Sequence, residues 1–222
     1  MKATNRLLVL AALFVTCLIT ANIIAVKIIG FGLGSWDILL PASIIVFPLT
    51  YVMGDVLTEV YGYRWARRVI WLGFACNLIF VFFAWVGGLL PGAVFWEGQG
   101  AYENILGNTP RLLIASFAAY LVGSFSNSVI LSRLKLITAG RWLWLRTIGS
   151  TIVGEGLDTV IFITIAFYGT PDFLKLCLYH WCGKVLLETL FTPLIYKVVS
   201  YLKRAEGIDT FDKGVDYNPF LF

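Results

Sequence analysis

The chain has 222 residues, of which 59% are hydrophobic and only 14% charged, and its formal net charge is +4 at pH 7. Soluble domains average about 25% charged residues, so this composition predicts a polytopic membrane protein, in which a modest positive charge is no sign of nucleic-acid binding. The single histidine, His180, excludes most histidine-based metal and haem sites within one chain, and the four cysteines lack zinc-site spacing. We therefore expect neither a metal nor a cofactor.

Six apolar runs follow one another along the chain, each long enough at about 1.5 Å per residue to cross a bilayer as a helix. They cover residues 7–29, 38–56, 69–90, 112–131, 147–168 and 173–199. A glycine-rich turn at 30–34 follows the first run, and Pro41 and Pro48 predict a kink in the second. The predicted fold class is all-α, with six transmembrane helices in residues 1–200 and a cytoplasmic tail at 201–222.

The positions of the basic residues predict the orientation. All but four of the 17 Lys and Arg residues lie near the two termini or in the second–third and fourth–fifth connections. The exceptions are Lys27, Arg111, Lys175 and Lys184. With six spans the basic segments all fall on one side, so both termini are expected in the cytoplasm.

Two carboxylates interrupt the fifth run, Glu155 and Asp158. Each costs roughly 2.5–3.5 kcal/mol near the bilayer midplane on insertion scales. Because they are three residues apart, they share one helix face, which we expect to turn inward toward partners, water or a ligand. The sixth run carries Lys184 and Glu188, four residues apart on one face. The opposite directions of the two helices place Asp158 near the depth of Lys184, and Glu155 near that of Glu188.

These four residues have two interpretations. They line a polar binding chamber between the helices, or they form a structural ion-pair network that joins the fifth and sixth helices. Three acids against one lysine leave a surplus charge that packing alone does not require, which favours the chamber. A surplus acid is either protonated or available to a ligand. Carboxylates bind paired N–H donors well, and guanine-like rings present such a pair, but protons and metal cations compete for the same oxygens.

Asp55 and Glu59, four residues apart at the end of the second run, are candidates for gating or coupling. The alternative is that they simply pair with Arg64, Arg67 and Arg68 at the level of the lipid headgroups. This pairing is the stronger competitor here because the three arginines follow closely in the sequence.

Four further residues are candidates for substrate binding, Asn22, Asn77, Asn127 and Phe162, and Lys27 is a further candidate for gating or coupling. The asparagines could bind substrate or only link helices by hydrogen bonds. Phe162, one turn after Asp158, could stack on a flat ligand or merely pack. Lys27 could take part in gating or snorkel to the outer surface.

Three motifs contain most of these residues. They are Gly54-Asp55-Val56-Leu57-Thr58-Glu59-Val60-Tyr61-Gly62-Tyr63 with Ala66-Arg67-Arg68, Val153-Gly154-Glu155-Gly156-Leu157-Asp158-Thr159, and Lys184…Glu188…Thr192-Pro193…Tyr196. Together they resemble the queuosine precursor transporter family, also called the vitamin-uptake transporter family, over about residues 22–200. The resemblance implies a bacterial inner-membrane protein that imports 7-cyano-7-deazaguanine or 7-aminomethyl-7-deazaguanine, precursors of the modified tRNA base queuosine.

The resemblance also implies roles for the buried charges. Glu155 and Asp158 would bind the donor edge of the ring, and Lys184 would balance charge or donate to the ring carbonyl. Glu188 would complete the polar shell or carry a coupling proton. The expected partners are a 7-deazaguanine-type small molecule and membrane lipid, without nucleic acid.

A second reading of the resemblance remains open. The family is similar in span count to the substrate-binding subunits of energy-coupling-factor vitamin transporters, which need a separate ATPase module. This chain has no Gly-Lys-Ser/Thr phosphate loop, so ATP coupling would require partner chains. The alternative function is therefore a vitamin- or nucleobase-binding membrane subunit.

The sequence has no HExxH or GxSxG motif, which argues against an intramembrane enzyme. The preferred precursor, the energy source and the formation of a homo-oligomer are left open.

Overall fold

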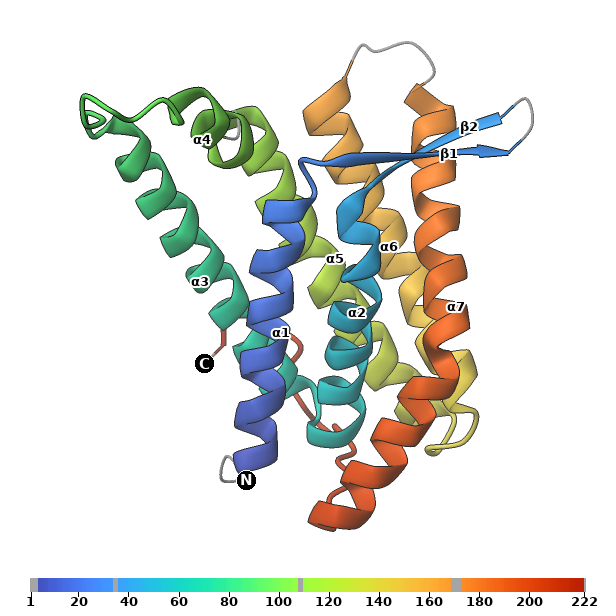
Figure 1. Ribbon diagram of the computed structural model, residues 1–222. Coiled ribbons are helices and arrows are strands. Elements are labelled where there is room, and N and C mark those ends of the chain that lie inside the picture. The colour runs from blue at the N-terminus through green and yellow to red at the C-terminus, as the bar shows by residue number, and fades with distance from the viewer. Residues whose placement is uncertain (1–3, 34–35, 108–109, 169–172, 222) are drawn as a thin grey trace.

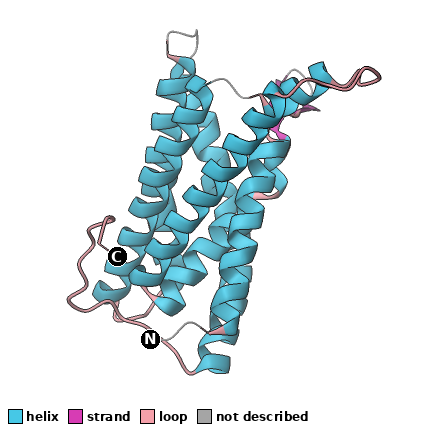
Figure 2. Ribbon diagram, turned by 90° about the vertical axis from the view of Figure 1, so that its left-hand side faces the viewer, coloured by secondary structure: helices cyan, strands magenta, loops and turns pink. Residues whose placement is uncertain are grey.

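The computed structural model describes residues 4–33, 36–107, 110–168 and 173–221, which form a bundle of long helices (Figure 1, Figure 2). The helices are α1 (Asn5–Ile24), α2 (Phe47–Val56), α3 (Tyr63–Leu89), α4 (Gln99–Leu106), α5 (Pro110–Ile137), α6 (Leu143–Phe167) and α7 (Phe173–Glu206). A 3-10 turn, η1 (Ala42–Ile45), precedes α2, and a π-helical turn, η2 (Leu57–Tyr61), follows it. Five segments are long and apolar enough to cross a membrane: α1, α3, α6, α7 and the run that contains α5. The chain is therefore a multi-pass membrane protein.

A β-hairpin departs from the expected all-helical pattern. β1 (Ile28–Leu33) pairs antiparallel with β2 (Trp36–Pro41), so that Ile28 lies opposite Pro41. Two adjacent isoleucines in β1 suit an extended strand, and two alternating glycines disfavour a helix. The expected second span, residues 38–56, is therefore wrong at its start, and its helix is the short α2 with a turn at each end. Six spanning helices were expected, and five of the described segments meet the criteria of length and composition.

The order of packing places α2 at the centre of the bundle. α1 packs against α2 and α3, α5 packs against α6, and α7 packs against both α6 and α2. The bundle has two distinct ends, which we call the terminal end, where α1 begins and α7 ends, and the hairpin end (Figure 1). The basic α2–α3 and α5–α6 connections also lie at the terminal end. An apolar core that includes Phe14, Val60 and Ile195 holds α1, η2 and α7 together.

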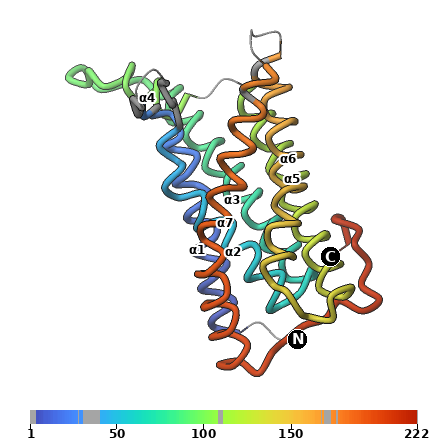
Figure 3. Tube along the Cα trace, turned by 90° about the vertical axis from the view of Figure 1, so that its right-hand side faces the viewer, coloured from blue at the N-terminus to red at the C-terminus, as the bar shows by residue number. Residues whose placement is uncertain are grey.

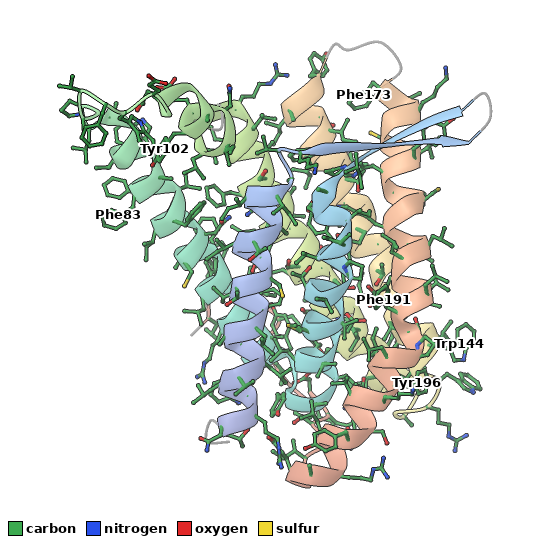
Figure 4. All side chains as sticks on the ribbon, in the orientation of Figure 1. Phe83, Tyr102, Trp144, Phe173, Phe191 and Tyr196 are labelled. Atoms are coloured by element: carbon green, nitrogen blue, oxygen red, sulfur yellow. The ribbon has the colours of Figure 1, made fainter. Side chains whose placement is uncertain are left out.

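The outer surface of the bundle is rich in exposed apolar side chains. Phe83 of α3 is 65% exposed and points away from the other helices (Figure 4). Trp144 of α6 and Tyr196 of α7 lie side by side on the opposite flank, where the Trp144 amide donates to the Tyr196 hydroxyl at 3.0 Å. Such a surface is suited to contact with lipid chains and interfacial headgroups.

Two glycines allow α5 and α6 to approach closely. A Cβ added at Gly154 would lie 2.7 Å from Asn127 Cβ, and one added at Gly123 would lie 2.7 Å from Asp158 Cβ. Small residues at a crossing let the backbones of two membrane helices come into contact. The crossing therefore fixes Asn127 and Asp158 beside the partner helix.

The chain after α7 packs along the terminal end (Figure 3). Asp212 accepts hydrogen bonds from the Tyr63 amide at 2.9 Å and from the Ser132 hydroxyl at 2.6 Å. The Trp71 indole donates to the Pro219 carbonyl at 2.8 Å. The tail is thus joined to α3 and α5, and α7 itself continues past residue 200, where the sequence predicted the membrane domain to end.

Candidate functional site

Polar side chains from four helices meet inside the bundle. We call this group the acidic cluster; its members are Asp55 of α2, Asn127 of α5, Glu155 and Asp158 of α6, and Lys184 and Glu188 of α7. Asp55 is 1% exposed, and Glu188 is completely buried. The sequence predicted all six as candidates, and the structure brings them together.

Lys184 is the cation of the acidic cluster. Its Nζ lies 3.0 Å from Glu155 Oε2, and it also donates to the Asp158 carboxylate. The Phe47 ring lies near the ammonium, with its centroid 5.9 Å away, and Tyr51 stacks on Phe47 and lies close enough to Glu155 to interact with it electrostatically. A cation near an aromatic face at this distance is stabilised by the ring quadrupole. Buried ion pairs therefore join α6 to α7 at the depth that the sequence predicted.

Asp55 and Glu188 lack this compensation. Asn127 donates to Asp55 Oδ1 at 2.8 Å, but the other Asp55 oxygen has no hydrogen-bond partner in the described ranges. Neither oxygen of Glu188 has a partner there. The two carboxyls are close enough to interact electrostatically with each other and with Glu155.

The acidic cluster therefore holds four carboxyl groups and one lysine. A buried carboxylate without a partner is strongly unfavourable, so the surplus groups bind protons, or they bind a ligand that brings donors. Within the described ranges, no group of three or more His, Cys, Asp or Glu side chains is arranged to hold a metal ion. Two surface hollows lie elsewhere, one of about 470 Å³ between α1 and α7 and one of about 330 Å³ beside Arg64 and Arg67.

Glu59 belongs to a different group, at the terminal end. Its Oε1 atom accepts from Arg146 at 2.8 Å and from Lys203 at 2.7 Å, and Lys135 lies 3.5 Å away. The expected alternative pairing with the arginines at 64, 67 and 68 is therefore wrong for Glu59. The π-helical turn η2 begins between Asp55 and Glu59, and the two carboxyls have different hydrogen-bond partners although they remain close enough to interact electrostatically.

Asp209 of the tail completes this second group, which we call the Glu59 clasp: Glu59, Lys135, Arg146, Lys203 and Asp209. Asp209 lies 2.5 Å from Lys135 and 2.8 Å from Lys203. Partial burial opposes ionisation of Asp209, but hydrogen bonds from the two lysines outweigh it and hold the pKa of this carboxyl below its ordinary value. The clasp ties η2, α5, α6, α7 and the tail together.

The remaining predicted residues lie on α1, α3 and α6 and before β1. Asn77 is buried on α3 with its side-chain oxygen unpaired within the described ranges, and Asn22 is half-buried on α1. Phe162 is half-buried on α6, one turn beyond Asp158, and Lys27 is exposed between α1 and β1.

Sequence reasoning missed Tyr51 and the cations of the Glu59 clasp. The signal for Tyr51 was its spacing of four residues from Asp55, which places both on one face of α2. Lys135 and Arg146 were used only to assign orientation, and nothing in their local sequence indicates that they turn inward.

Buried, incompletely paired charges inside a bundle of membrane-crossing helices define a polytopic membrane protein of the transporter class. The family model described as "Putative vitamin uptake transporter" matches residues 41–198, and the chain belongs to this family. The matched region contains the whole acidic cluster. This membership confirms the resemblance indicated by the three motifs.

Two curated relatives agree with the family match. A "Queuosine precursor transporter" of Escherichia coli (strain K12) is 30% identical over 159 residues, which cover 69% of this chain and 69% of the relative. A "Probable queuosine precursor transporter" of Bacillus subtilis (strain 168) is 31% identical over 159 residues, covering 64% of this chain and 67% of the relative. Both are named as transporters rather than enzymes. No solved structure shows significant similarity to this chain.

Proposed function

We propose that this protein imports queuosine precursors, 7-cyano-7-deazaguanine or 7-aminomethyl-7-deazaguanine, across a bacterial inner membrane. The observation that carries the proposal is the surplus of carboxyl groups in the acidic cluster. A guanine-type ring presents a ring N–H beside an exocyclic amine, and carboxylates bind such paired donors in bidentate, charge-assisted geometry. The names of the two relatives supply the class of substrate.

The neighbouring side chains suit a flat, polar ring. The stacked pair of Phe47 and Tyr51, with centroids 5.9 Å apart and planes inclined by 4°, lies beside Lys184. Stacking on an aromatic ring contributes about 1–3 kcal/mol per base in nucleic-acid complexes. Lys184 would donate to the ring carbonyl or balance the charge of Glu155 and Asp158.

The proposed topology has six crossings. The start of α1 and the end of α7 both lie at the terminal end, which requires an even number of crossings (Figure 1). The helical stretch of η1, α2 and η2, residues 42–61, supplies the additional one, with a length of roughly 30 Å at about 1.5 Å per residue. Because the basic connections gather at the terminal end, that end is assigned to the cytoplasm.

A test in cells follows from the proposed substrate. Cells that can neither synthesise nor import the precursor would express this chain, and the queuosine content of their tRNA would be measured with 7-cyano-7-deazaguanine in the medium. The wild-type chain and the exposed control variant Glu97→Gln should restore queuosine, whereas Glu155→Gln should not, at equal amounts of folded membrane protein. Full restoration by Glu155→Gln would contradict the proposed site.

The alternative is a binding subunit that depends on a separate ATPase module, as in energy-coupling-factor transporters. It makes a different prediction, because the isolated chain would bind the ligand without moving it across a membrane. Co-purification of an ATPase with the chain would support this alternative.

A further inference from the structure

Glu188 differs from the other carboxyl groups of the acidic cluster in its hydrogen bonding. Lys184 engages both Glu155 and Asp158, and Asn127 occupies one oxygen of Asp55. Glu188 is fully buried, and neither of its oxygens has a hydrogen-bond partner within the described ranges. It therefore presents two free oxygens on one carboxyl group.

The surroundings of Glu188 are predominantly acidic. Titratable groups in and beside the acidic cluster include Tyr51 and Asp55 of α2, Glu59 of η2, Glu155 and Asp158 of α6, and His180 and Lys184 of α7. Glu59 is neutralised by the cations of its clasp, and Lys184 is held by two other carboxylates. The charged groups that act on Glu188 electrostatically are Asp55 and Glu155, which are also carboxyls. An ionised Glu188 would thus be unpaired, buried and repelled.

We propose that Glu188 is a carboxylic acid in the empty protein, and that it releases its proton when both of its oxygens accept the paired N–H edge of a guanine-type ligand. The inference rests on the proposed function and assigns the donor-edge contact to Glu188, while Glu155 and Asp158 hold Lys184 in position for the ring carbonyl, so Glu155 stays necessary for transport. In the reaction, the acid O–H bond breaks, one proton leaves to the solvent, and the resulting carboxylate accepts two N–H bonds.

The geometry favours Glu188 over its neighbours for this contact. A bidentate complex needs both oxygens of one carboxylate, and Asp55 has only one oxygen free because Asn127 holds the other. Binding to Glu155 or Asp158 would require the ligand to displace Lys184. The two N–H donors of the ligand would stabilise the ionised form of Glu188, which otherwise has no hydrogen-bond donor in the described ranges. Ligand binding therefore favours loss of its proton.

The first arm of the test needs no ligand. Infrared difference spectra of the purified, folded protein at neutral pH, taken as wild type minus Glu188→Gln, should contain a carboxylic-acid C=O band. The control difference, wild type minus Glu97→Gln, should not. If the wild-type protein lacks the acid band of Glu188, the inference is overturned whatever the protein transports.

The second arm measures binding of 7-cyano-7-deazaguanine and of its analogue without the exocyclic amine. Calorimetry in two buffers of different ionisation heat should show release of about one proton per bound ligand in the wild type and almost none in Glu188→Gln. The wild type should prefer the complete ring by about 10- to 100-fold, as expected for one charge-assisted hydrogen bond, and the variant should lose most of that preference.

The outcomes separate the two proposals. If folded wild-type protein binds neither compound, the proposed function fails. If it binds the complete ring with no proton release, or if Glu188→Gln keeps the full preference, the proposed function stands and the assignment to Glu188 is overturned. Monodisperse elution and an unchanged circular dichroism spectrum identify folded Glu188→Gln protein, and Glu188→Asp provides a second variant that retains the carboxyl.

Discussion

Lys184 lies 3.0 Å from Glu155 and joins α7 to α6 in the interior of the bundle. It also pairs with Asp158, so removal of its charge leaves two buried carboxylates without a cation. We expect Lys184→Met to lower the free energy of unfolding by about 3–5 kcal/mol, the usual effect of breaking a buried ion pair at one partner. Thermal unfolding of the purified protein would measure this, with Lys213→Met on the exposed tail as the control.

The same pair allows a rescue experiment. If Lys184→Met lowers the free energy of unfolding because two buried carboxylates lose their cation, adding Glu155→Gln and Asp158→Asn should restore more than half of that free energy. The side chains at the three positions are then all neutral. Losses that simply add in the triple variant would contradict this explanation.

Glu59 should prove structural rather than functional. Glu59→Gln leaves the three cations of the Glu59 clasp without their shared carboxylate, and we expect a loss of about 3–5 kcal/mol in the free energy of unfolding. Transport by the fraction that remains folded should be close to that of the wild type. A folded Glu59→Gln protein with full stability and no transport would instead support the gating role expected from the sequence.

The ion pairs of Asp209 should make the stability of the protein depend on pH. The pKa of its carboxyl is below the ordinary value of about 3.9 because Lys135 and Lys203 bind the ionised form. Its contribution is therefore complete above the ordinary pKa and is lost as the pH falls through the lowered one. The difference in melting temperature between wild type and Asp209→Asn should be constant from neutral pH to about pH 5 and should shrink below about pH 4. A difference that grows on acidification would refute the assignment.

The close crossing of α5 and α6 can be tested with one methyl group. Gly154→Ala would put its Cβ 2.7 Å from Asn127 Cβ and 3.1 Å from the Gly123 carbonyl oxygen, so the helices must separate. We expect a loss of about 1–3 kcal/mol in the free energy of unfolding, as for overpacked cores. Gly183→Ala on α7 is the matched control, since its added Cβ meets no atom within 4 Å and should be neutral or slightly stabilising. Equal melting temperatures for the two variants would show that the crossing tolerates the methyl group.

The meeting of Lys184 with Glu155 and Asp158 could be predicted from the sequence, because helix periodicity fixes the face and the order of spans fixes the depth. The hairpin could not, since the apolar stretches before Ile28 and around residues 38–41 look the same as the ends of membrane helices. The different partners of Asp55 and Glu59 could not be predicted either, because the two acids lie four residues apart and nothing in the local sequence distinguishes them. The partners of Glu59 come from positions 135, 146 and 203, and only the packed bundle brings them to it.

We propose that this chain alone moves a 7-deazaguanine-type ring across a membrane through the acidic cluster. The most direct measurement is uptake of labelled 7-cyano-7-deazaguanine by sealed liposomes that contain only the purified chain. We predict uptake that excess unlabelled precursor blocks and riboflavin does not, and that Glu155→Gln abolishes while Glu97→Gln preserves it. Folded wild-type protein that binds the ring but never accumulates it would contradict an independent transporter, and protein that neither binds nor accumulates it would contradict the proposed substrate.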